Sequence, residues 1–63
     1  NQSFELALWL PTYADVDAEY ERLLKLGLNI LSGEPTTYDF GIRNFYVAVP
    51  EGNLIEIGSM NKA

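Results

Sequence analysis

The residue best placed for chemistry is Glu56, which stands between Ile55 and Ile57 near the end of the chain. A carboxylate inside an apolar strand is costly if it is buried without a partner, so water, a cation or a metal ion must satisfy it. Glu5 is a second carboxylate in an apolar run, near the start of the chain. If the two share a face they could bind a divalent ion, because hard and borderline cations accept oxygen ligands.

Glu56 belongs to a predicted β-hairpin. Two apolar runs near the end of the chain are joined by the sequence Pro-Glu-Gly-Asn. Pro50 presets the backbone for the first central position of a turn, and Gly52 suits its last position. Two runs joined in this way predict a hairpin. Because side chains alternate along a strand, Leu54 and Glu56 should point to the same face.

One strand and one helix are predicted in the first half of the chain. Residues 4–10 form an apolar run that Pro11 ends, which favours a strand. A helix is expected over 15–26, with Asp15 as its N-cap and Gly27 as a left-handed C-terminal cap. The apolar stripe of this helix consists of Val16, Tyr20, Leu23 and Leu24.

A short strand candidate follows the helix at 28–34 and is stopped by Pro35, and residues 36–40 form a loop or a ragged strand start before the hairpin. The order of strand, helix and three strands predicts an α+β fold, with one helix on a mixed four-stranded sheet. A single helix can cover only one face of such a sheet. The strand residues expected beneath it are Phe4, Leu6, Leu8, Ile55 and Ile57.

The opposite face of the sheet combines aromatic, aliphatic and acidic side chains. Strand alternation places on it Glu5, Trp9, Asn44, Tyr46, Ala48, Leu54 and Glu56. Such a mixture suits neither a core nor an ordinary wet surface. It indicates half of a concave site that another module completes. Trp9, Tyr46 and Leu54 are the predicted ligand-binding residues, although Trp9 could equally serve only in packing.

Composition excludes several functions. The 63 residues are 48% hydrophobic and 13% aromatic, which is typical of a globular chain. Cysteine and histidine are absent, so no thiolate site, disulfide or imidazole base exists. The net charge of −5 argues against nucleic acid and anionic membranes. No apolar stretch approaches the roughly 20 residues that span a bilayer. No signal peptide is recognised, so a cytoplasmic location is expected.

The last third of the chain resembles the vicinal oxygen chelate superfamily, the group of glyoxalase I, bleomycin-resistance proteins and extradiol dioxygenases. Members often end a module with Gly-x-Arg-x-Phe-Tyr-Val-x-Asp-Pro-x-Gly-Asn-x-Ile-Glu. The matching residues are Gly41, Arg43, Phe45, Tyr46, Val47, Pro50, Gly52, Asn53, Ile55 and Glu56. Val49 departs from the pattern, because it replaces the Asp before Pro. The order of elements also matches, so the resemblance covers residues 1–63 as one βαβββ module.

The resemblance implies that two modules share a cup-shaped site. Each module supplies one metal ligand from its first strand and one from its last, which Glu5 and Glu56 would provide here. The second module would belong to the same polypeptide, if this chain is the C-terminal half of a longer one, or to a homodimer. The chain opens Asn-Gln-Ser without an initiator Met, as a piece of a longer protein would.

Three function classes follow from the resemblance. The first is a metal-dependent lyase, isomerase or dioxygenase that uses a divalent ion (Zn, Ni, Mn, Mg or Fe), with Glu56 as metal ligand and catalytic base. The second is a metal-free small-molecule binder of the bleomycin-resistance type, in which aromatic side chains hold the drug. The third is a structural or dimerisation module with a degenerate site. The absence of histidine disfavours an oxygenase with two His ligands and one carboxylate.

Overall fold

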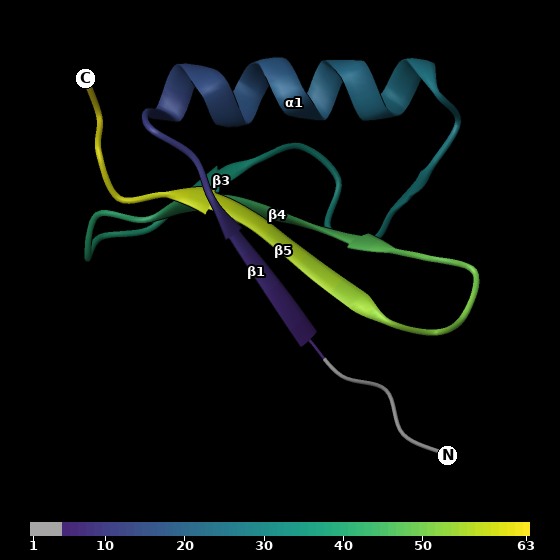
Figure 1. Ribbon diagram of the computed structural model, residues 1–63. Coiled ribbons are helices and arrows are strands. Elements are labelled where there is room, and N and C mark those ends of the chain that lie inside the picture. Colours follow the sequence, from purple (N-terminus) through teal and green to yellow (C-terminus); the bar gives the residue numbers. More distant parts are fainter. Residues whose placement is uncertain (1–4) are drawn as a thin grey trace.

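The computed structural model describes the backbone of residues 5–63 and the side chains from Leu6 onward. It confirms an α+β fold with a single helix on one side of a mixed sheet (Figure 1). The elements are β1 (Glu5–Trp9), α1 (Tyr13–Lys25), β2 (Asn29–Ile30), β3 (Thr36–Thr37), β4 (Arg43–Ala48) and β5 (Leu54–Ser59).

The sheet has five strands rather than the predicted four. Its order is β1-β5-β4-β2, and β3 pairs with β4 as well. β1 runs parallel to β5, while the remaining pairs are antiparallel. Gly33, with φ of 73°, and Pro35 separate β2 from β3. Proline cannot donate to a strand ladder and Gly33 turns the chain, so β2 occupies only part of the strand expected over 28–34, and β3 falls in the segment 36–40 that was expected as a loop or a ragged strand start.

Helix α1 begins earlier than predicted, because Thr12 is the N-cap and Asp15 is not. The Thr12 hydroxyl accepts the Asp15 amide proton at 3.3 Å, and Asp15 Oδ2 accepts the Thr12 amide proton at 3.0 Å. This reciprocal pair is a capping box, in which Asp15 takes the place that Glu or Gln usually fills. At the other end, Gly27 has φ of 81° and caps the helix in the left-handed conformation, as predicted.

The core lies between α1 and the β4–β5 hairpin. Val16 and Leu23 of α1 are buried against Phe45, Val47 and Ile57. In the hairpin register Phe45 lies opposite Ile57. The ring of Tyr20 meets that of Phe45 edge to face, at a centroid distance of 5.5 Å. The hairpin therefore turns its apolar side toward the helix and its other side away from it.

Strand β1 lies outside the cover of the helix, which corrects part of the predicted core. Leu6 and Leu8 face the helix side of the sheet yet are 53% and 52% exposed, and Leu24 of α1 is also exposed. The helix packs on β4 and β5. Because a helix is about 10 Å wide and strands lie about 4.8 Å apart, one helix covers about two strands. Phe4, the remaining β1 residue expected in the core, lies outside the described residues.

Candidate functional site

The sheet face opposite α1 is called the open face here. Strand pairing sets Ala7 opposite Glu56 and Trp9 opposite Gly58 between β1 and β5. Between β4 and β5, Tyr46 lies opposite Glu56 and Ala48 opposite Leu54. Since paired residues share a face, Trp9, Tyr46, Leu54 and Glu56 all belong to the open face, as strand alternation predicted.

Glu56 is half-buried and is held by the side chain of Asn44. The Asn44 amide nitrogen donates to Glu56 Oε2 at 2.7 Å, across the hairpin. Asn44 is only 6% exposed, so its side chain is fixed in place. Among the described residues, no hydrogen bond to Glu56 Oε1 is found. Of the two carboxylate oxygens of Glu56, the described residues therefore satisfy one.

Gly58 allows Trp9 to lie across β5. A Cβ atom added to Gly58 would sit 3.1 Å from Cζ3 of Trp9 and 3.0 Å from Cβ of Asn44. The indole ring thus occupies the space that a side chain at position 58 would need. Trp9 is nevertheless 48% exposed, so part of the ring is presented to solvent. Gly58 therefore leaves room for the indole on the face that also carries Asn44, the residue that holds Glu56.

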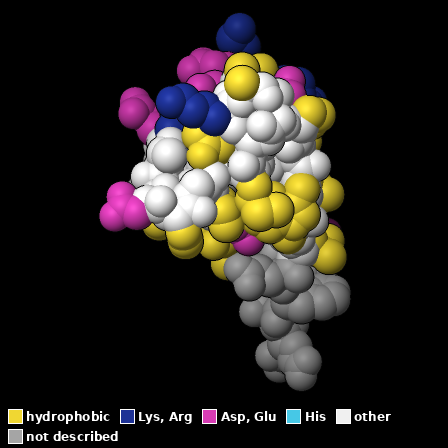
Figure 2. All heavy atoms as spheres, turned by 90° about the vertical axis from the view of Figure 1, so that its left-hand side faces the viewer, with side chains coloured by type: hydrophobic (Ala, Val, Ile, Leu, Met, Phe, Trp, Pro, Cys, Tyr) yellow, Lys and Arg dark blue, Asp and Glu magenta, His cyan; other side chains and the backbone are white. Residues whose placement is uncertain are grey.

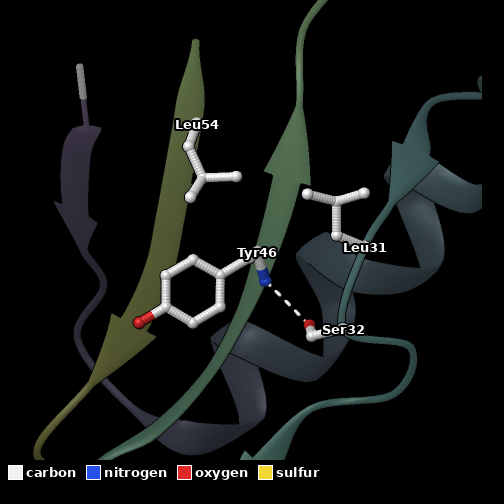
Figure 3. A pocket seen from close by; sticks show the side chains of 4 residues that line it. All are labelled: Leu31, Ser32, Tyr46 and Leu54. Atoms are coloured by element: carbon white, nitrogen blue, oxygen red, sulfur yellow. Dashed lines mark hydrogen bonds between the residues drawn. The ribbon is translucent and has the colours of Figure 1, made fainter. Parts of the chain in front are cut away.

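A hollow of about 380 Å³ opens on this face beside Glu56. Its walls are Leu31, Ser32, Tyr46 and Leu54, and α1 lies behind the sheet (Figure 3). The Ser32 hydroxyl accepts the Tyr46 amide proton at 2.9 Å, and the Leu31 amide donates to the Tyr46 carbonyl. Tyr46 and Leu54 were predicted for ligand binding. Leu31 and Ser32 were not, because only the pairing of the β2 region with β4 brings them there.

The predicted metal ligands are only partly described. The backbone of Glu5 pairs with Leu54 of β5, but the Glu5 side chain lies outside the described part of the chain. Within residues 6–63, no three His, Cys, Asp or Glu side chains gather in one place. Glu56 is therefore the one open-face carboxylate that the structure describes. The roles of Glu5 and Glu56 as metal ligands stay predictions.

The fixed ion pairs of the described residues lie on the helix side. Arg43 pairs with Asp17 of α1 at 2.8 Å and donates to the Thr37 hydroxyl. Within α1, Arg22 pairs with Glu19 at 2.6 Å, and hydrogen bonding to the guanidinium lowers the pKa of the Glu19 carboxyl. In Figure 2 the charged side chains gather toward the helix end of the molecule and hydrophobic ones below them. Neither ion pair includes Glu56.

No helix in the described part of the chain is both long and apolar enough to cross a membrane. The model of the Glyoxalase/Bleomycin resistance protein/Dioxygenase superfamily matches residues 1–57. A comparison with curated proteins found no match.

Solved structures share this fold over nearly the whole chain. A glyoxalase/bleomycin resistance protein/dioxygenase from Nocardioides has a TM-score of 0.85 and 26% identity, covering 98% of this chain and 40% of its own. A "conserved domain protein" has a TM-score of 0.81 and 30% identity, covering 97% and 51%. Lactoylglutathione lyase from Agrobacterium tumefaciens, with a TM-score of 0.80, 20% identity and coverage of 94% and 42%, shares the fold alone. The chain spans about half the length of these structures, or less.

Proposed function

Because the chain belongs to the Glyoxalase/Bleomycin resistance protein/Dioxygenase superfamily, we propose that its open face is one half of a cup that binds a small molecule. A second βαβββ module supplies the other half. The observation that carries this proposal is the hollow bounded by Tyr46 and Leu54, next to Glu56. Small-ligand sites are mostly apolar concavities with a few placed polar groups, which this arrangement provides.

The exposed strand β1 supports the need for a second module. It stands at the edge of the sheet, and its far side pairs with no strand of the described chain. Leu6 and Leu8 on that strand are half exposed, although the helix side of β4 and β5 is buried. An apolar, unpaired edge strand is a surface on which another chain can dock. In the solved structures that match, the part that this chain does not cover is about as long as the matching part, or longer.

A divalent metal is compatible with the donor atoms of the open face. Glu56 would hold it through the oxygen that Asn44 leaves available, with Glu5 as the predicted second ligand. The remaining ligands would come from the second module. When bound, the ion would supply Lewis-acid polarisation of adjacent substrate oxygens. Asn44 would keep the Glu56 carboxylate in position, while Tyr46 and Leu54 would hold the apolar part of the substrate and exclude water.

Metal-free binding is the second candidate function, as in drug-binding proteins of the bleomycin-resistance type. The observation in its favour is the Asn44–Glu56 hydrogen bond, in which a neutral side chain rather than a cation satisfies one carboxylate oxygen. In this case the exposed ring of Trp9 and the Tyr46 and Leu54 side chains would contact the ligand directly.

Native mass spectrometry of the protein, purified without chelator, tests both candidates. A particle with two modules and a divalent ion that is lost in Glu56→Gln supports the metal-dependent function. The matched control is Glu21→Gln, which neutralises an exposed carboxylate of α1 and should retain the ion. Two modules without metal, even after divalent ions are added, support metal-free binding. A stable 7.1 kDa monomer would contradict the half-cup proposal.

A further inference from the structure

We propose that the ligand of the open face carries an organic cation, an ammonium or guanidinium group, with Glu56 as its counter-ion and Trp9 as its aromatic platform. This inference rests on the metal-free form of the proposed function, because it names the chemical class of the small molecule that the cup takes when Glu56 holds no metal ion. The binding site that we propose consists of Glu56, the indole ring of Trp9, and the hollow that Tyr46 lines.

The charge of Glu56 has no cationic partner among the described residues. Both ion pairs found within residues 6–63 are located elsewhere, at Glu19 and Asp17. Three of the four basic residues belong to the helix side: Arg22 and Lys25 in α1, and Arg43, which reaches Asp17. Glu56 is half-buried, and among the described residues its one hydrogen-bond donor is the neutral amide of Asn44. A partly desolvated carboxylate with a neutral partner gains more from a cation than a solvated one does.

Aromatic surface lies beside this carboxylate. The Trp9 ring lies over Gly58, and Asn44, whose amide holds Glu56, lies opposite Gly58 on β4, so the indole and the carboxylate share one face of the sheet. Tyr46 lies directly opposite Glu56 on β4. A cation is attracted by the face of an aromatic ring, and tryptophan is the strongest such partner. An aromatic ring near a carboxylate is therefore suited to alkylammonium and guanidinium groups.

The hollow gives room for the rest of such a molecule. Its volume of about 380 Å³ is at the lower end of small-ligand pockets, which hold about 300–1,000 Å³. Leu31 and Leu54 provide apolar walls, and the hydroxyl of Ser32 can donate to an acceptor of the ligand while it accepts the Tyr46 amide proton. The net charge of −5 also favours the approach of a cation over that of an anion.

The test compares choline with 3,3-dimethylbutan-1-ol, which has the same shape but no charge. Trp9 is the single tryptophan of the chain, so its fluorescence reports binding at the open face. Choline should bind about tenfold more tightly than the neutral alcohol, a difference of about 1.4 kcal/mol. In Glu56→Gln this difference should shrink to the part that the aromatic ring of Trp9 contributes. Glu21→Gln, on α1, should preserve the difference.

A second variant protects the test against a Glu56 variant that does not fold. In Trp9→Leu, choline binding measured by calorimetry should weaken by about two- to fivefold, because the cation–aromatic attraction is one part of the tenfold preference. Equal binding of choline and the alcohol by the unchanged protein would overturn this inference and leave small-molecule binding intact. Binding of the alcohol but not of choline by the two-module particle would also overturn this inference and leave small-molecule binding intact. The proposed function fails separately, if only a monomer forms.

Discussion

The Asn44 side chain donates to Glu56 Oε2 at 2.7 Å, from a position that is 6% exposed. This hydrogen bond links the two strands of the hairpin on the face that the helix leaves open. A hydrogen bond to a charged group contributes more than one between neutral groups, about 1.5–3 kcal/mol. The carboxylate is therefore both tolerated in an apolar strand and held in one orientation.

A double-mutant cycle measures this relationship. Asn44→Ala and Glu56→Gln should each lower the free energy of unfolding, and the double variant should lose less than their sum by about 1 kcal/mol. The cycle removes the cavity effect that Asn44→Ala also creates. Urea unfolding followed by circular dichroism gives the four values. Effects that add to within about 0.3 kcal/mol would show that the bond contributes no coupling.

Gly58→Ala should displace Trp9. The new Cβ would lie 3.0–3.1 Å from Asn44 Cβ, the Arg43 carbonyl oxygen and Trp9 Cζ3. The backbone oxygen cannot move easily, but the half-exposed indole can. We expect a loss of about 1–3 kcal/mol from overpacking, together with a shift of the Trp9 emission maximum in the folded protein.

Gly52→Ala is the matched control for that experiment. Gly52 has φ of 92° in the β4–β5 turn, and no atom lies within 4 Å of an added Cβ. This variant should lose stability through backbone strain while the folded-state emission of Trp9 is unchanged. The interpretation of Gly58 is wrong if both variants shift the emission equally.

Leu6→Asn and Leu8→Asn should weaken association with a second module while leaving the module itself folded. Both side chains are half exposed on the edge strand β1, so their replacement removes little burial within one module. If they are buried at the junction between modules, each change should weaken pairing by about tenfold or more. Sedimentation of the unchanged and variant proteins measures this effect. Leu26→Asn serves as the control and should pair normally, because Leu26 is 63% exposed and is the C-cap residue at the end of α1 that lies away from β1 (Figure 1).

Thr12→Ala should destabilise the module by about 1 kcal/mol, because it removes the hydroxyl that caps α1. Thermal unfolding measures the loss. Thr36→Ala in β3, where the side chain is exposed, should change the midpoint far less. If both variants lower the midpoint equally, the loss comes from replacing a threonine with alanine in general and not from the helix cap.

Glu19 predicts a pH dependence of stability. Hydrogen bonding to Arg22 lowers the pKa of the Glu19 carboxyl below its ordinary value of 4.5. Because the pKa is lowered in the folded state, the pair stabilises the protein fully at pH values above the ordinary pKa of 4.5. This contribution is lost as the pH falls through the folded-state pKa. Glu19→Gln should thus lower the thermal midpoint slightly at pH 7 and leave it unchanged in strong acid. The effect is small, because the pair is solvent-exposed.

The sequence by itself determined the order of the first strand, the helix and the hairpin, and the two faces of the hairpin. Alternation along residues 54–59 required Leu54 and Glu56 to share a face, and the turn at Pro50 and Gly52 fixed the pairing with β4. These are local properties, since the direction of a side chain in a strand follows from its position alone. The left-handed cap at Gly27 was equally local, because glycine adopts positive φ at low cost.

Only the tertiary structure decided which apolar residues are covered. Leu6 and Leu8 have the pattern of core residues, yet α1 packs over β4 and β5 and leaves them exposed. Strand alternation gives the face of a side chain but not the position of the helix across the sheet. The same limit applies to Ser32, which reaches the hollow through pairing with a strand 14 residues away. Long-range register, unlike strand direction, depends on how the whole chain packs.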